Sequence, residues 1–112
     1  MKENILINKS IAFAARIVKL HDFLIKNKRG LTIANQVIRS GTSIGANINE
    51  ANYGQSRADM LSKFEIALKE CSETEGWLQL LFNTNVINED TYKKHRNLCG
   101  RIRRILISSC KT

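Results

Sequence analysis

Apolar residues recur along this chain at the three- and four-residue spacings of amphipathic helices, in four segments separated by short polar stretches. We expect helices over about residues 8–26, 31–53, 57–83 and 89–110. No segment alternates in the manner of a strand, and the chain has no proline to interrupt a long helix. The pattern therefore predicts an all-α fold. Because short connections let successive helices lie antiparallel, the expected architecture is an antiparallel up-down-up-down four-helix bundle, with residues 1–112 as a single domain.

The first predicted helix carries an apolar row and, on the opposite arc, a row of cations. The apolar row is Ile11, Ala14, Ala15, Val18 and Ile25. The cationic row is Lys9, Arg16, Lys19 and Lys26. We expect the apolar row to face the core. Further along the chain, Ser56 and Asn88 are the predicted N-caps of the third and fourth helices.

The second predicted helix contains an unusual stretch, RSGTSIGANINEA, over residues 39–51. Gly41 and Gly45 lie four residues apart, on the same side as Ile44 and Ile48. Each glycine costs a helix about 1 kcal/mol relative to alanine, so we interpret the pair as a place where another helix packs closely. No Gly-Lys-Ser/Thr follows, so the glycines do not indicate a phosphate-binding loop.

The third predicted helix has more apolar surface than one core face requires. Ile66, Trp77 and Leu80 lie about a third of a turn from its main apolar face. One interpretation is that this helix is central and Trp77 covers an edge of the bundle. The other is that the three residues form an oligomer interface, because a tryptophan ringed by charge is typical of a contact anchor. We favour the interface.

Charge is segregated along the chain, whose formal net charge is +8. Residues 1–49 hold eight Lys/Arg against two acids, residues 50–90 hold three against eight, and residues 91–112 hold seven against none. The cations singled out in the last segment are Lys93, Arg96, Arg101, Arg103 and Arg104. They either bind a polyanion such as RNA or DNA, or complement the helix dipole and pair with acids of the third helix, namely Glu70, Glu73 and Glu75.

Catalytic chemistry has little support in the sequence. His21 and His95 lie on different predicted helices, and neither belongs to a Glu-x-x-His pair. The three cysteines, Cys71, Cys99 and Cys110, lack metal-ligand spacing. We therefore expect a protein that is not an enzyme and has no cofactor and no metal. With no signal peptide and no run of 18 apolar residues, we expect it in the cytoplasm and not in a membrane.

Four short stretches carry a family resemblance: RSGTSIGANINEA, GQS at 54–56, ALKE at 67–70 and WLQLL at 77–81. From about Lys9 to Ile107, the chain resembles the small four-helix-bundle proteins encoded in 23S rRNA intervening sequences. These are similar in turn to the accessory variability determinants of diversity-generating retroelements. The resemblance implies a homopentamer, and in the retroelement relatives a basic surface that binds nucleic acid and a reverse transcriptase as partner. No catalytic residues are known for the family.

Two functions from different classes follow. The first is a non-catalytic, oligomeric protein that binds nucleic acid through the basic faces of the first and fourth helices. Phe23 and Tyr92 are too few and too scattered for a stacking platform, so we expect contacts to phosphates with little sequence specificity. The alternative is a protein-interaction scaffold whose basic surface meets an acidic protein partner.

Overall fold

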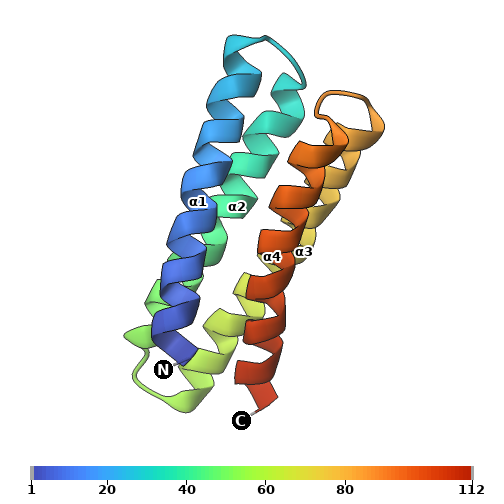
Figure 1. Ribbon diagram of the computed structural model, residues 1–112. Helices are drawn as coiled ribbons and strands as arrows, with labels where there is room; N and C mark the ends of the chain where they lie inside the picture. The colour runs from blue at the N-terminus through green and yellow to red at the C-terminus, as the bar shows by residue number, and fades with distance from the viewer. Residues whose placement is uncertain (1, 112) are drawn as a thin grey trace.

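The computed structural model describes the backbone of residues 2–111 and the side chains of residues 5–111. It contains four helices, α1 (Lys2–Lys26), α2 (Leu31–Asn52), α3 (Arg57–Asn83) and α4 (Glu89–Lys111), and no strand within that range. Successive helices run in opposite directions and form a rod about 44 Å long and 19 Å across (Figure 1). The prediction of an all-α, four-helix fold is confirmed. Within the described range, no helix combines the length and apolar character that crossing a membrane requires.

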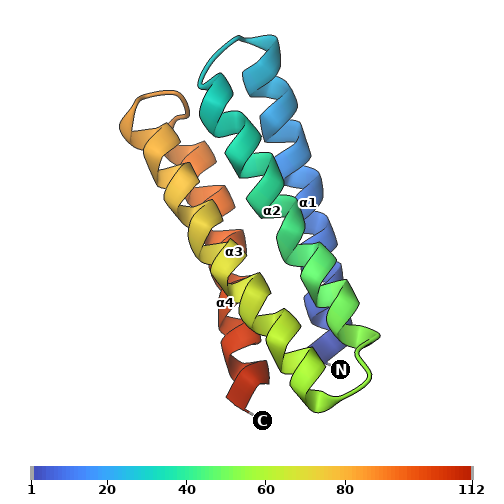
Figure 2. The same ribbon diagram turned by 180° about the vertical axis from the view of Figure 1, so that it is seen from behind.

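The helices stand at the corners of a square, so each touches two neighbours. Helix α2 packs on α1 and α3, and α4 packs on α3 and α1 (Figures 1 and 2). The α1–α2 and α3–α4 turns share one end of the rod, and the α2–α3 turn lies at the other. The two turns at the shared end are joined by Arg29, whose Nη2 donates to the carbonyl oxygen of Asn85 at 2.9 Å.

The face of α1 that packs into the core is not the predicted one. Its buried row is Leu6, Ser10, Phe13, Ile17, Leu20 and Leu24. Ile11 of the predicted row is 62% exposed, and Val18 and Ile25 are also exposed. Both rows repeat every seven residues and lie about 120° apart on the helix, so periodicity alone does not choose between them. The row with Phe13 and the leucines removes more apolar surface from water, and this decides the orientation.

Helix α1 also begins earlier than predicted, at Lys2 and not at about residue 8. Leu6 is the reason, because it continues the buried row by one further turn.

Helices α1 and α2 approach each other closely at the two glycines of α2. A Cβ added to Gly41 would lie 2.9 Å from both Cγ1 and Cγ2 of Ile17, which is closer than real Cβ atoms come to a neighbour. A Cβ added to Gly45 would lie 3.3 Å from the Oγ of Ser10. The missing side chains of α2 thus make room for the buried row of α1.

The N-termini of α3 and α4 are capped by the predicted side chains. The Ser56 Oγ accepts a hydrogen bond from the backbone N–H of Asp59 at 3.1 Å. The Asn88 Oδ1 accepts one from the backbone N–H of Thr91 at 2.8 Å. Each cap satisfies one of the N–H groups that a helix leaves unpaired in its first turn.

Candidate nucleic-acid interface

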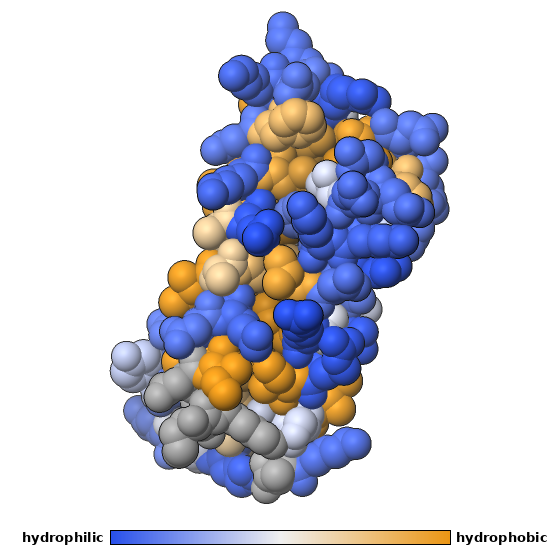
Figure 3. Space-filling model, viewed as in Figure 1, coloured by the Kyte–Doolittle hydropathy of each residue, from blue (hydrophilic) through white to orange (hydrophobic). Residues whose placement is uncertain are grey.

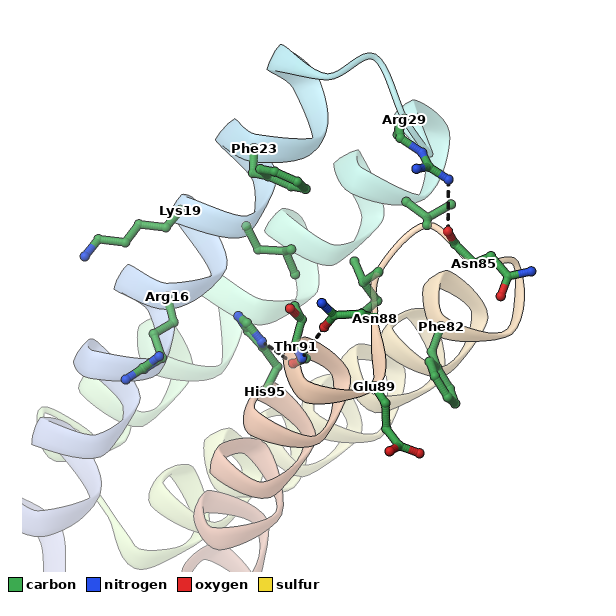
Figure 4. Close-up of a pocket in the computed structure, with 13 residues that line it drawn as sticks. Arg16, Lys19, Phe23, Arg29, Phe82, Asn85, Asn88, Glu89, Thr91 and His95 are labelled. Atoms are coloured by element: carbon green, nitrogen blue, oxygen red, sulfur yellow. Dashed lines mark hydrogen bonds between the residues drawn. The ribbon is translucent and has the colours of Figure 1, made fainter.

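The seam between α1 and α4 is the least extensively packed of the four helix contacts, and it opens into a cleft beside the two paired turns. The cleft has a volume of about 710 Å³ (Figure 4). Three cations line it, Arg16 and Lys19 from α1 and Arg29 from the α1–α2 turn, together with the ring of Phe23. Its polar floor includes Asn88 and His95 from the start of α4.

The seam runs from this cleft to the opposite end of the rod (Figure 1). There, Ile5 of α1 and Ile105 of α4 line a smaller hollow of about 230 Å³, which Arg104 borders. Apolar side chains emerge along the face between the two helices, with hydrophilic side chains on either side (Figure 3). The seam therefore has a hollow at each end, with apolar side chains and cations in the lining of both.

Helical spacing places two more predicted cations at this seam. Lys9 lies four residues after Ile5 and seven before Arg16, so it shares their flank of α1. Arg101 lies four residues before Ile105 and shares its flank of α4. Among the described side chains, Arg16, Lys19, Arg101 and Arg104 form no ion pair.

The remaining predicted cations of α4 are engaged by neighbours within the chain. The Arg103 Nε donates to the Glu75 carboxylate of α3 at 2.9 Å. The guanidinium of Arg96 lies 5.0 Å from the centre of the Tyr92 ring, a cation–π geometry. The Lys93 Nζ lies 3.6 Å from the carboxylate of Glu89, one turn earlier.

The acids of α3 are therefore divided between two helices. Glu75 pairs with α4, whereas Glu70 and Glu73 both bind Arg39 of α2, at 3.1 Å and 2.9 Å. Of the three acids expected to neutralise the cations of α4, only Glu75 contacts one. Most of the basic charge of α4 is left on the surface.

Two residues of the cleft, Arg29 and Phe23, are not predicted as site residues from the sequence. Arg29 follows the predicted first helix and reaches the cleft only because its turn is joined to Asn85, far along the chain. Phe23 and Tyr92 are too few and too scattered in the sequence to predict a stacking platform. In the structure Phe23 is 54% exposed at the cleft, whereas Tyr92 is buried with its ring stacked on Phe82 at 4.8 Å. No sequence signal identifies either residue, since the cleft joins segments that are distant in sequence.

The predicted oligomer patch lies on the α2 side of α3. Ile66 and Leu80 are exposed, and Trp77 is half-buried beside an apolar hollow of about 460 Å³ over Gly76. A Cβ added to Gly76 would meet no atom within 4 Å, so the backbone is bare there. The indole Nε1 of Trp77 is buried without a hydrogen-bond acceptor among the described residues. A buried donor without a partner costs free energy, which an acceptor from outside would recover.

The buried thiols are poorly suited to chemistry. The Cys99 Sγ lies 3.6 Å from the carbonyl oxygen of Cys71, and hydrogen bonding with Cys71 together with burial raises the pKa of the Cys99 thiol. A thiol that stays protonated is a weak nucleophile. Over the part of the chain that the structure describes, no group of three or more His, Cys, Asp or Glu residues is placed to hold a metal ion.

Comparisons with known proteins agree on a family. Residues 2–108 match the 23S rRNA-intervening sequence proteins. The fold is similar to the crystal structure of a protein of unknown function of the S23 ribosomal protein family from Bacteroides thetaiotaomicron, with a TM-score of 0.96 and 49% sequence identity over the full length of both chains. No curated protein matches the sequence. Since the family match spans all four helices, the chain belongs to the 23S rRNA-intervening sequence proteins.

Proposed function

We propose that the chain is a non-catalytic, homo-oligomeric RNA-binding protein that holds the phosphate backbone along the seam between α1 and α4. The observation that supports this most strongly is the set of cations at both edges of the seam, Arg16 and Lys19 on α1 and Arg101 on α4. Since no described acid pairs with these three side chains, their charge is available to phosphates.

RNA is the polyanion that the family name favours, because it links the relatives to 23S rRNA. Contacts to phosphates carry no sequence information, so binding is expected to depend strongly on salt and weakly on sequence. Arginine at the seam suits this role, since its planar guanidinium can make paired hydrogen bonds to a phosphate.

The test is a fluorescence anisotropy titration of an RNA hairpin at several salt concentrations from about 50 to about 200 mM. Wild type is compared with the triple variant Arg16→Ala, Lys19→Ala, Arg101→Ala. The control triple variant, Arg57→Ala, Lys63→Ala, Lys69→Ala, loses the same charge from α3. Each lost phosphate contact lowers the log–log salt slope by about 0.7 to 0.9, so the seam variant is expected to lose about 2 from the slope. The control should keep the wild-type slope.

Equal losses in the two triple variants would mean that net charge, and not the seam, attracts RNA. If wild type fails to bind RNA even at low salt, the RNA-binding function is wrong. The basic face would then belong to the alternative, a protein-interaction scaffold that binds an acidic protein partner.

Assembly into a ring of identical copies is the second part of the proposal. Two exposed apolar surfaces support it: Ile11, Val18 and Ile25 on α1, and the patch around Trp77 on α3. A contact between two different surfaces is head-to-tail and can close into a ring, and the family resemblance favours five copies. Repeating the basic seam around a ring would raise the avidity for RNA above the affinity of one subunit.

A further inference from the structure

The cleft at the paired turns has features that phosphate contacts do not use. Its volume of about 710 Å³ falls within the range of about 300 to 1,000 Å³ that is common for small-ligand sites. It is closed on one side by the joined turns, where Arg29 contacts Asn85. A surface that only follows a phosphate backbone needs cations, and it needs neither a cavity nor an aromatic ring.

Phe23 supplies an aromatic face at the side of this cleft. It projects from α1 above the cleft (Figure 4), and 54% of it is exposed although it is a large apolar side chain. The other aromatic ring lining the cleft, Phe82, already stacks on Tyr92 with the ring planes 3° apart. Phe23 is therefore the ring with a free face, and nucleic-acid bases stack on such faces.

His95 supplies a hydrogen-bonding group to the cleft. Its Nδ1 lies 2.7 Å from the carbonyl oxygen of Thr91, and because a carbonyl only accepts, Nδ1 carries the hydrogen. In the neutral ring Nε2 is then an acceptor, and no described side chain or backbone group is paired with it. The residue is only 8% exposed, and its ring is directed from α4 toward α1 (Figure 4). An amino group on the edge of a base is a donor suited to that position.

The charges around the cleft complete a set of groups suited to binding a nucleotide. Arg16 and Lys19 line the cleft from α1, with their side chains extending outward from the helix and away from the ring of Phe23, and Arg29 lies on the side of the turns (Figure 4). Glu89 is the single carboxylate in the lining, and Lys93 lies 3.6 Å from it, which offsets its charge. The lining thus holds an aromatic face, a hydrogen-bond acceptor and cations on two sides.

We infer that this cleft binds one unpaired nucleotide of an RNA strand. Its base would stack on Phe23 with one edge toward His95, and its flanking phosphates would contact Arg16 and Lys19. This inference rests on the proposed RNA-binding function and deepens it, because it adds a preference for unpaired bases. The same chemistry would also accept a free nucleotide, so the experiment separates the two sources.

The probes are an oligoadenylate of about eight nucleotides, an abasic oligomer with the same number of phosphates, and a fully paired RNA duplex. The variants are Phe23→Ala, Phe23→Tyr and, as a control, Tyr53→Ala. Tyr53 is 80% exposed and lies at the opposite end of the rod, so its loss removes an aromatic residue outside the cleft. Because Phe23 is itself exposed, its replacement should not unfold the protein, which circular dichroism verifies.

Phe23→Ala is expected to weaken binding of the oligoadenylate about tenfold, within the range that one base–aromatic stack contributes. Phe23→Tyr and Tyr53→Ala should bind it as wild type does, and none of the variants should change duplex binding. The abasic oligomer should bind wild type at least as weakly as the oligoadenylate binds Phe23→Ala, because it lacks both the stacked base and the edge directed at His95. Adenosine monophosphate should compete only at concentrations well above those of the oligoadenylate, because it lacks the second phosphate.

The inference is overturned if Phe23→Ala binds the oligoadenylate as tightly as wild type does, or if the abasic oligomer binds wild type equally well. In both cases duplex binding remains, so the proposed function survives without a base site. If adenosine monophosphate competes as well as the oligoadenylate, the cleft is a free-nucleotide site and the RNA assignment is wrong. If no RNA binds to wild type, the proposed function itself fails.

Discussion

Gly41 and Gly76 are both helical glycines, yet they lie in opposite packing environments. A Cβ on Gly41 would lie 2.9 Å from two carbon atoms of Ile17 in the core. At Gly76 the same atom would have nothing within 4 Å. Alanine improves helix propensity by about 1 kcal/mol at either site, so the difference between the two substitutions reports packing alone.

We expect Gly41→Ala to lower the free energy of unfolding by up to about 2 kcal/mol, since overpacking typically costs about 1 to 3 kcal/mol and the helix propensity of alanine offsets about 1 kcal/mol of that cost. Gly76→Ala should raise that free energy by up to about 1 kcal/mol. Urea denaturation followed by circular dichroism measures both. A gain in stability in Gly41→Ala equal to the gain in Gly76→Ala would contradict the close packing of α1 on α2.

At the residue scale, features set by the local spacing of residues could be predicted from the sequence. The residues that meet in the cleft because two turns contact each other could not. Close packing at the glycines of α2 could be predicted because they interrupt an apolar stripe at regular positions. The cleft residues Arg29 and Phe23 could not, because their environment depends on a contact between two turns. Lys28 and Asn85 in those turns have positive φ angles of 54° and 62°, conformations that their residue types do not specify.

At the scale of single helices, the positions of all four could be predicted, but the orientation of α1 could not. Phe13 lies in one heptad row and Ile11 in another, and both rows are apolar. Which row turns inward depends on how well each fills the space between the other helices, and this is a property of the packed bundle. Helix α4 has one apolar face, with Ile102 and Leu106 buried on it.

The N-cap of α4 gives a prediction at this scale. Replacing Asn88 by alanine removes the acceptor for the Thr91 N–H, and we expect a loss of about 1 kcal/mol in the free energy of unfolding. Asn97→Ala is the matched control, because Asn97 is exposed in the middle of α4, where alanine is favourable. Equal stability of the two variants in urea would show that Asn88 does not cap the helix.

At the scale of the whole molecule, the proposed ring depends on the patch around Trp77. We expect wild type to form an oligomer, and Trp77→Ala to shift it toward the monomer of 12.7 kDa while its helical circular dichroism signal is kept. Light scattering after size-exclusion chromatography gives the mass, and Tyr53→Ala serves as the control. A wild-type mass of 12.7 kDa at micromolar concentration would contradict assembly.

The central claim is that RNA lies along the seam between α1 and α4, and ultraviolet crosslinking to an RNA hairpin with peptide mass spectrometry tests it most directly. Aromatic and cationic side chains that touch RNA are candidates for crosslinks, so the map reports location independently of affinity. We expect crosslinked peptides from residues 9–26 of α1 and 94–105 of α4. We also expect crosslinking to fade as salt rises. Crosslinks confined to α2 or α3, or spread evenly over all four helices, would contradict the claim.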